Sequence, residues 1–139
     1  MLHRSELLAQ ARAAMARSYA PYTHFQVGAA LEGASGRVYL GCNVENAAYS
    51  ACNCAERTAF FKAVSEGERA FLQIAIVGGL HGAISGFAPP CGVCRQVMSE
   101  FCGEDFAVHL WDGRQEKTMT LGAHLPLSFT DAALRSPED

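Results

Sequence analysis

The sequence of 139 residues has no apolar run long enough to cross a membrane, and its first residues are charged and amphipathic. These absences argue against a membrane contact and a secretory signal, so we expect a cytoplasmic protein. Basic residues form no run, and the formal net charge is −3. Because proteins that bind phosphate backbones usually carry clustered Lys and Arg, we expect no nucleic-acid partner.

The sequence also lacks internal repeats, low-complexity segments and any linker that would divide it. Its length fits one domain, expected over residues 1–139, with a polar C-terminal tail from about 130 to 139. Half of the residues are hydrophobic, so a core can form without disulfide bonds. Six cysteines in a cytoplasmic chain of this length indicate reduced thiols, and clustered thiols point to a metal or to catalysis.

Hydrophobic periodicity predicts helices that alternate with strands. The expected helices are 5–18, 54–65 and 91–101, with Ser5 as the N-cap of the first and Gly67 as the C-terminal cap of the second. The expected strands are 25–32, 37–42, 71–77, 106–111 and 117–120. This order is typical of the α/β class, so we expect a three-layer α/β/α sandwich around a mixed sheet of about five strands.

The cysteines supply the strongest functional signal. Cys91 and Cys94 lie three residues apart at a predicted helix start, so they share one face and can hold one metal ion. Spacing alone leaves Cys52 and Cys54 both open as the third ligand. Cys54 is favoured because it begins a helix, where backbone N–H groups stabilise a thiolate. Glu56 then lies beside the metal with no structural task, which is typical of a catalytic zinc site with an open fourth position.

Two other interpretations of these cysteines stay open. Cys91 and Cys94 alone are also typical of a redox pair or of two core residues. If Cys52 joined Cys54, the site would be a closed four-cysteine zinc module without catalysis. In a three-thiolate site, the thiolates leave about one net negative charge even with Zn²⁺ counted, and we expect Arg57 to offset it by bonding ligand sulfurs.

Four blocks of the sequence combine these residues with further specific patterns. They are Phe25-Gln26-Val27-Gly28-Ala29-Ala30-Leu31, Gly41-Cys42-Asn43-Val44-Glu45-Asn46-Ala47, Cys54-Ala55-Glu56-Arg57-Thr58-Ala59 and Pro90-Cys91-Gly92-Val93-Cys94-Arg95-Gln96. Over nearly its whole length the chain resembles the short, homotetrameric cytidine deaminases of the cytidine/deoxycytidylate deaminase superfamily. The all-cysteine site with a nearby glutamate fits the general pattern of zinc deaminases. Two departures are a glycine-rich loop at 78–89 and Pro89-Pro90 in place of the more usual Ser-Pro.

The resemblance implies zinc-dependent hydrolytic deamination of cytidine and 2′-deoxycytidine to uridine and 2′-deoxyuridine, with release of ammonia, in pyrimidine salvage. It implies one Zn²⁺ per subunit with Cys54, Cys91 and Cys94 as ligands. Glu56 is then the catalytic residue that carries protons from the water to the base, and Arg57 supports the ligands.

Several substrate contacts follow from the resemblance. Asn43 and Glu45 are two residues apart, so they face the same way on an extended segment, which suits ribose hydroxyls. The resemblance assigns them to the 3′-hydroxyl. It places Phe25 against the pyrimidine and the backbone of Ala55 beside the base.

The resemblance also implies a homotetramer whose sites are shared between subunits, with Tyr49 and Phe129 entering a neighbour's site. Three rival functions are a blasticidin-type nucleoside deaminase, a polynucleotide deaminase and a zinc module without activity. Asn43 and Glu45 favour cytidine over blasticidin, and the acidic charge balance argues against a polynucleotide.

Overall fold

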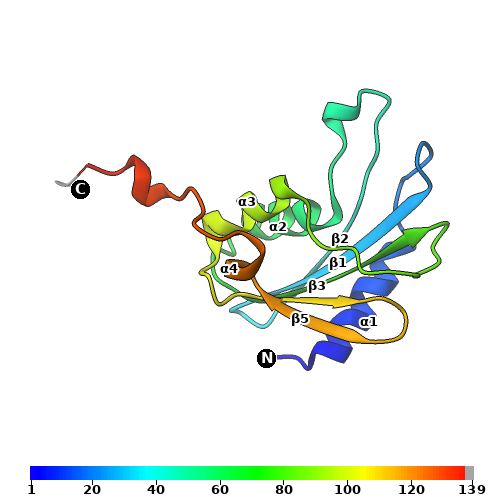
Figure 1. Cartoon of the computed structure of the whole chain (residues 1–139), viewed down its shortest axis with the longest axis horizontal. Helices are drawn as coiled ribbons and strands as arrows, with labels where there is room; N and C mark the ends of the chain where they lie inside the picture. The colour runs from blue at the N-terminus through cyan, green and yellow to red at the C-terminus, as the bar shows by residue number, and fades with distance from the viewer. Residues whose placement is uncertain (137–139) are drawn as a thin grey trace.

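The computed structural model of the protein describes residues 1–136 and has a single sheet at its centre (Figure 1). The strand order is β2-β1-β3-β4-β5. The pair β3–β4 is parallel and the other pairs are antiparallel, so the predicted mixed sheet of about five strands is confirmed. The strands are β1 Phe25–Gly33, β2 Val38–Cys42, β3 Phe71–Leu80, β4 Ala107–Trp111 and β5 Glu116–Thr120.

Helices cover both faces of the sheet, as the α/β/α prediction requires. The helix α1 (Arg4–Met15) lies on one face, and α2 (Ala55–Ser65) and α3 (Gly92–Phe101) lie on the other (Figure 1). Within residues 1–136, none of the helices combines the length and apolar character that a bilayer crossing requires. The shorter elements are α4 Leu121–His124 and the 3-10 turns η1 Tyr49–Ala51 and η2 Asp131–Leu134.

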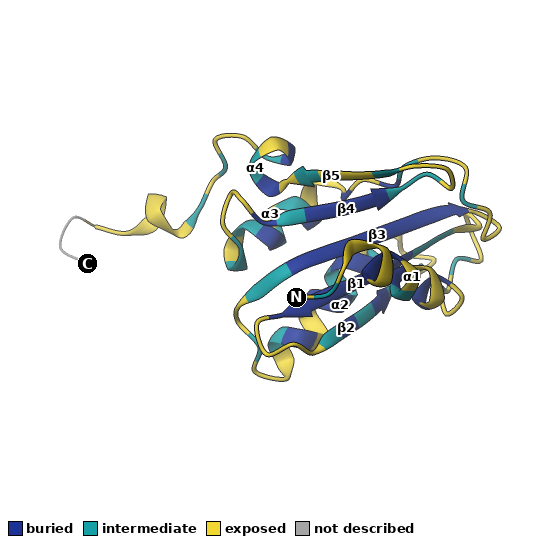
Figure 2. Ribbon diagram, turned by 90° about the horizontal axis from the view of Figure 1, so that it is seen from below, coloured by how far each residue is buried: buried dark blue, intermediate teal, exposed yellow. Residues whose placement is uncertain are grey.

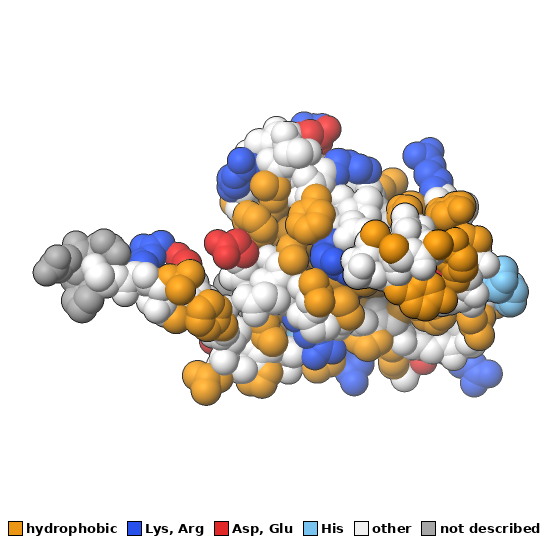
Figure 3. Space-filling view, turned by 90° about the horizontal axis from the view of Figure 1, so that it is seen from above, with side chains coloured by type: hydrophobic (Ala, Val, Ile, Leu, Met, Phe, Trp, Pro, Cys, Tyr) orange, Lys and Arg blue, Asp and Glu red, His pale blue; other side chains and the backbone are white. Residues whose placement is uncertain are grey.

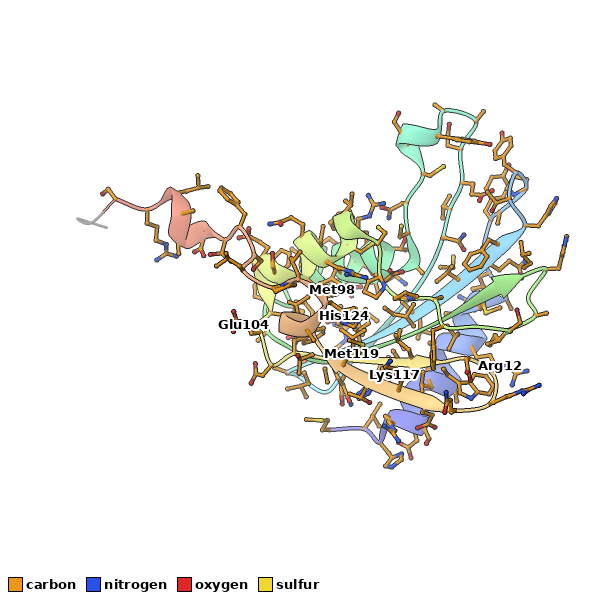
Figure 4. The ribbon with its side chains drawn as sticks, viewed as in Figure 1. Arg12, Met98, Glu104, Lys117, Met119 and His124 are labelled. Carbon is orange, nitrogen blue, oxygen red and sulfur yellow. The ribbon has the colours of Figure 1, made fainter. Side chains whose placement is uncertain are left out.

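Two hydrophobic clusters fill the space between the layers. The larger cluster joins α2 and α3 to the sheet around Phe60, which is fully buried, and includes Met98 of α3 (Figure 4). The smaller cluster joins α1 to the other face through residues such as Leu7. Because β3 has a cluster on each face, most of it is buried (Figure 2), as expected of a central strand in a covered sheet.

Glycine at position 41 sets the distance between α2 and the sheet. A Cβ on Gly41 would lie 2.3 Å from the backbone oxygen of Ala55 and 2.6 Å from the nitrogen of Ala59. No side chain fits at that separation, so the first turn of α2 can rest directly on β2 only because residue 41 is glycine. This contact positions the start of α2, where the candidate site is built.

The structure corrects some predicted element ends. Ser5 is not the N-cap of α1: His3 is, and its Nδ1 accepts a hydrogen bond of 3.2 Å from the Ser5 N–H. The helix ends at Met15 rather than at residue 18. The strand β3 continues to Leu80 because Gly78 pairs with β1 through backbone groups, which do not depend on its side chain.

The polar C-terminal tail predicted at 130–139 contains η2 and extends away from the sheet and helices (Figure 1). Residues 137–139 of that prediction lie outside the described residues.

Candidate active site and metal centre

The N-termini of α2 and α3 meet at a cluster of thiols. Cys54 is the N-cap of α2 and Cys91 is the N-cap of α3, and neither side chain makes a capping hydrogen bond to its own helix. Instead their Sγ atoms lie 3.6 Å apart. Cys94, in the first turn of α3, completes a group whose Sγ atoms all lie within 4.8 Å of one another.

These distances fit a zinc ion. Tetrahedral zinc with sulfur ligands at about 2.3 Å separates those sulfurs by about 3.8 Å. The Sγ atoms of Cys54 and Cys91 are close to this separation and all three sulfurs lie within 4.8 Å of one another, so Cys54, Cys91 and Cys94 could hold the ion. Cys52 is not part of the cluster, because its Sγ contacts the backbone N and O of Asn46 at 3.3 and 3.6 Å.

The surroundings of Cys54 favour its thiolate form. Hydrogen bonds from Cys94, Arg57 and Cys91 lower the pKa of the Cys54 thiol to about 5, against the opposing effect of burial. The N-terminal end of α2 acts in the same direction, since its unpaired N–H groups carry partial positive charge. A thiolate is the form that binds a metal, so Cys54 is prepared for one, whereas a hydrogen bond with Cys54 and then burial raise the pKa of the Cys94 thiol.

Glu56 is a buried carboxyl group next to these thiols. Its side chain is 4% exposed, and burial raises its pKa to about 7. The first turn of α2 therefore carries a metal-binding thiolate and, two residues later, a carboxyl group that can both accept and release protons near neutral pH.

A pocket of about 750 Å³ opens above the thiol cluster. It is lined by most of the residues predicted for the site, and Tyr49, which the resemblance places in a neighbour's site, lines the pocket of its own chain. Those that line it are Phe25, Asn43, Glu45, Tyr49, Cys54, Ala55, Glu56, Arg57 and Cys91. Cys94 lies buried beneath. Phe129, by contrast, lies on the C-terminal segment outside the pocket lining of the same chain and is 61% exposed.

The side chain of Asn43 is held by backbone groups of β1. Its Oδ1 accepts hydrogen bonds from the N–H of Val27 at 2.9 Å and from the hydroxyl of Ser18. Its Nδ2 donates to the carbonyl of Phe25 at 2.7 Å. These bonds fix which end of the amide is oxygen and leave one N–H of Asn43 without a hydrogen-bond partner among residues 1–136.

The site also contains residues to which the sequence patterns assign no role, although Val93 and Arg95 belong to the block that begins at Pro90. Phe87 and Val93 line the pocket, but an aromatic or aliphatic residue in a loop or first helical turn looks like an ordinary packing residue. Arg95 bonds the carbonyl of Pro90 at 2.7 Å and that of His124 at 2.7 Å, so it ties the approach to α3 against α4. Its position directly after Cys94 is the sequence feature that indicates a role near the site.

Comparison with known proteins agrees with this geometry. Residues 1–110 match the family model described as the cytidine and deoxycytidylate deaminase zinc-binding region. A cytidine deaminase of Sporosarcina psychrophila is 48% identical over 127 residues, which cover 90% of each chain. One from Halalkalibacterium halodurans is 45% identical over 130 residues, covering 93% of this chain and 96% of that relative.

Solved structures give the same result. The crystal structure of cytidine deaminase from Burkholderia pseudomallei superposes with a TM-score of 0.84 at 45% identity, covering 93% of this chain and all (100%) of that one. Cytidine deaminase from Mycobacterium tuberculosis gives 0.78 at 36% identity, covering 93% and 98%. The three-thiol cluster, the match of the family model and these relatives together establish that the chain belongs to the zinc-dependent cytidine and deoxycytidylate deaminase family.

Proposed function

We propose that this protein deaminates cytidine and 2′-deoxycytidine by hydrolysis, giving uridine and 2′-deoxyuridine with release of ammonia. The observation that carries the proposal is the buried carboxyl of Glu56 in the lining of a pocket that Cys54 and Cys91 of the thiol cluster also line. Hydrolytic deamination needs an activated water and a proton carrier at one place, and the first turn of α2 brings both together.

When bound by Cys54, Cys91 and Cys94, zinc supplies the Lewis acid that lowers the pKa of a water. Glu56 accepts a proton from the attacking water and delivers it to the ring nitrogen beside the amino-bearing carbon. Glu56 then takes the proton that remains on the hydroxyl added to the carbon and transfers it to the amino group. The carbon–nitrogen bond breaks, ammonia leaves, and the carbonyl of uridine forms. A pKa near 7 suits both transfers, because the carboxyl group must act first as a base and then as an acid.

Asn43 and Glu45 are suited to bind one ribose hydroxyl, which we assign as the 3′-hydroxyl. Asn43 has one N–H left to donate after its contacts with β1. The carboxylate of Glu45 keeps a free acceptor position beyond the three hydrogen bonds that it receives from Tyr22 and Thr23. A hydroxyl group both accepts and donates, so it satisfies the two side chains at once.

The base occupies the deeper part of the pocket in this proposal. Phe25 contributes a ring that packs against the pyrimidine, and the backbone of Ala55 contacts the polar edge of the base. Both residues line the pocket next to the thiol cluster. Blasticidin-type substrates lack the ribose for which Asn43 and Glu45 are arranged.

We further propose a homotetramer with sites shared between subunits. Tyr49 sits on the projecting 46–53 loop and is 69% exposed, and Phe129 is 61% exposed. Figure 3 shows hydrophobic side chains gathered on the face that carries this loop. Aromatic rings as exposed as these gain stability when another subunit buries them. In the proposed tetramer they complete a neighbour's pocket.

Light scattering tests the assembly. The tetramer predicts a mass about four times that of the 14.9 kDa chain, and a monomer mass at working concentration would contradict it.

We place the reaction in pyrimidine salvage in the cytoplasm. The six free cysteines support a reducing compartment.

Ultraviolet-monitored turnover with zinc-loaded protein tests the reaction. Cytidine, 2′-deoxycytidine, cytosine and blasticidin S are compared side by side. We expect the absorbance of both nucleosides to fall, with much slower change for cytosine and blasticidin S. If cytidine absorbance does not change, the proposed function is wrong.

A further inference from the structure

The hydroxyl of Thr23 connects two residues that the proposed function assigns to substrate binding. It donates a hydrogen bond to Oε2 of Glu45 and accepts one of 3.0 Å from the N–H of Phe25. Thr23 itself has no assigned task in the reaction. Among the described residues, its hydroxyl oxygen is the one side-chain atom that forms hydrogen bonds with both Glu45 and Phe25.

The hydrogen bonds of Glu45 fix the direction of its remaining acceptor. Oε1 accepts the N–H groups of Tyr22 at 2.9 Å and of Thr23 at 3.1 Å, which fill its two acceptor positions. Oε2 accepts the Thr23 hydroxyl and has one position left. The Thr23 hydroxyl is the hydrogen bond that holds Oε2, and it completes the fixing of the carboxylate plane that the two N–H bonds to Oε1 begin.

We propose that Thr23 is a positioning residue that orients the Glu45 carboxylate toward the ribose 3′-hydroxyl and thereby sets the affinity for nucleosides. This inference rests on the proposed function and deepens it. Without the hydroxyl, only the two N–H bonds to Oε1 hold the carboxylate, so its plane is held less tightly and the free acceptor of Oε2 is directed less well into the pocket.

The backbone around Thr23 is built to hold this hydroxyl in place. The N–H of His24 bonds the carbonyl of Ala20 at 3.0 Å, and His24 has a positive φ of 62°, so the chain turns sharply just after Thr23. The N–H of His81 bonds the carbonyl of His24 at 2.7 Å and ties this turn to the segment after β3. Thr23 and Glu45 both line the pocket, so the hydroxyl acts at the site itself.

Two variants separate the hydroxyl from the shape of the side chain. T23V keeps the shape and removes the hydroxyl, whereas T23S keeps the hydroxyl. We expect T23V to raise the KM for cytidine and 2′-deoxycytidine about tenfold with kcat changed much less, as fits loss of a hydrogen bond to a charged group. T23S is expected to stay close to the wild type.

A double-mutant cycle tests whether the effect passes through Glu45. In an E45A background, adding T23V should change kcat/KM less than twofold, because there is no carboxylate left to orient. The substrate 3′-deoxycytidine should likewise show little difference between wild type and T23V. Thermal unfolding checks that the variants fold. If T23V does not fold, T23A serves as a second variant without the hydroxyl.

The outcomes distinguish this inference from the proposed function. A wild-type protein that does not deaminate cytidine defeats the proposed function and this inference with it. A wild type that is active while T23V and T23A match it in KM defeats this inference alone. This inference is also defeated if T23V has as large an effect with 3′-deoxycytidine, or in the E45A background, as it has with cytidine in the wild type. The hydroxyl would then act by another route.

Discussion

The Nη2 atom of Arg57 lies 3.4 Å from the Sγ atom of Cys54, within the first turn of α2. Hydrogen bonds to Cys54 and Cys94 hold the guanidinium beside the thiol cluster. Its Nε is buried and has no hydrogen-bond partner among residues 1–136. Three thiolates and a divalent zinc ion leave about one negative charge, which weakens the ability of the metal to acidify water. We expect Arg57 to supply the compensating positive charge.

Replacing Arg57 by glutamine should therefore weaken both metal binding and catalysis. We expect R57Q to lose about 10–100-fold in zinc affinity or in kcat/KM, the range seen when a partner of metal ligands is removed. Competition with a coloured chelator measures the affinity, and cytidine turnover measures the activity. R114Q removes one charge from an exposed turn and serves as the matched control. Equal affinity and activity in R57Q and R114Q would contradict the role given to Arg57.

Serine variants of Cys54 and Cys52 decide between the open and the closed zinc site. The Sγ of Cys54 belongs to the cluster, whereas that of Cys52 contacts Asn46. C54S should lose most of its zinc and its activity, and C52S should keep about one zinc ion per chain with nearly full activity. Elemental analysis of the purified variants gives the metal content. If C52S lost zinc to the same extent as C54S, the four-cysteine module would be the better description.

The sequence was sufficient to predict the thiol cluster because its ligands sit at helix starts. Local spacing at the start of α3 brings Cys91 and Cys94 together. Cys54 lies 37 residues before Cys91, and its place at the start of α2 is what favoured it over Cys52. Thr23 and Phe87 were not predicted as site residues. Their roles depend on loops that meet in space, since Thr23 bonds Glu45 across 22 residues of chain. Short-range sequence patterns do not predict such a contact.

The ends of elements were the weaker part of the fold prediction. The sequence predicts Ser5 as the N-cap because hydroxyl side chains are common at that position, whereas the structure has His3 there. The end of β3 was placed too early because Gly78 and Gly79 have low strand propensity. Pairing with β1 on one side outweighs that propensity, which only the tertiary structure reveals.

Substituting glutamine for Glu56 should separate catalysis from folding. Glutamine has nearly the same shape and no ionisable proton, and the site is already adapted to a buried side chain. We expect E56Q to retain its zinc and its thermal midpoint while kcat falls by roughly 10²–10⁴ or more, as for loss of general acid–base catalysis. Turnover, metal content and thermal unfolding are measured on one preparation. Full activity in E56Q would rule out the proposed mechanism.

His109 is a buried histidine on the face of the sheet opposite the pocket. Its Nε2 lies 2.7 Å from Oε1 of Gln73, so this nitrogen is the donor. Its Nδ1 lies 2.8 Å from the hydroxyl of Thr118, which also accepts a hydrogen bond of 3.1 Å from Arg4. The neutral ring satisfies all of these contacts. Burial, followed by the charge of Arg4, lowers the pKa of His109 below its usual value, although Glu116 opposes the shift.

This lowered pKa predicts a loss of stability in mild acid. In the unfolded chain a histidine gains a proton as the pH falls below about 6.5, whereas the folded protein resists protonation until a lower pH. The unfolded state then binds more protons, so the free energy of unfolding decreases from pH 7.5 to 5.5. H109Q removes this contribution, and its thermal midpoint should fall less over that range than that of the wild type. H81Q, at an exposed position, should follow the wild type. Identical pH profiles for the wild type and H109Q at constant ionic strength would show that His109 does not limit the acid stability.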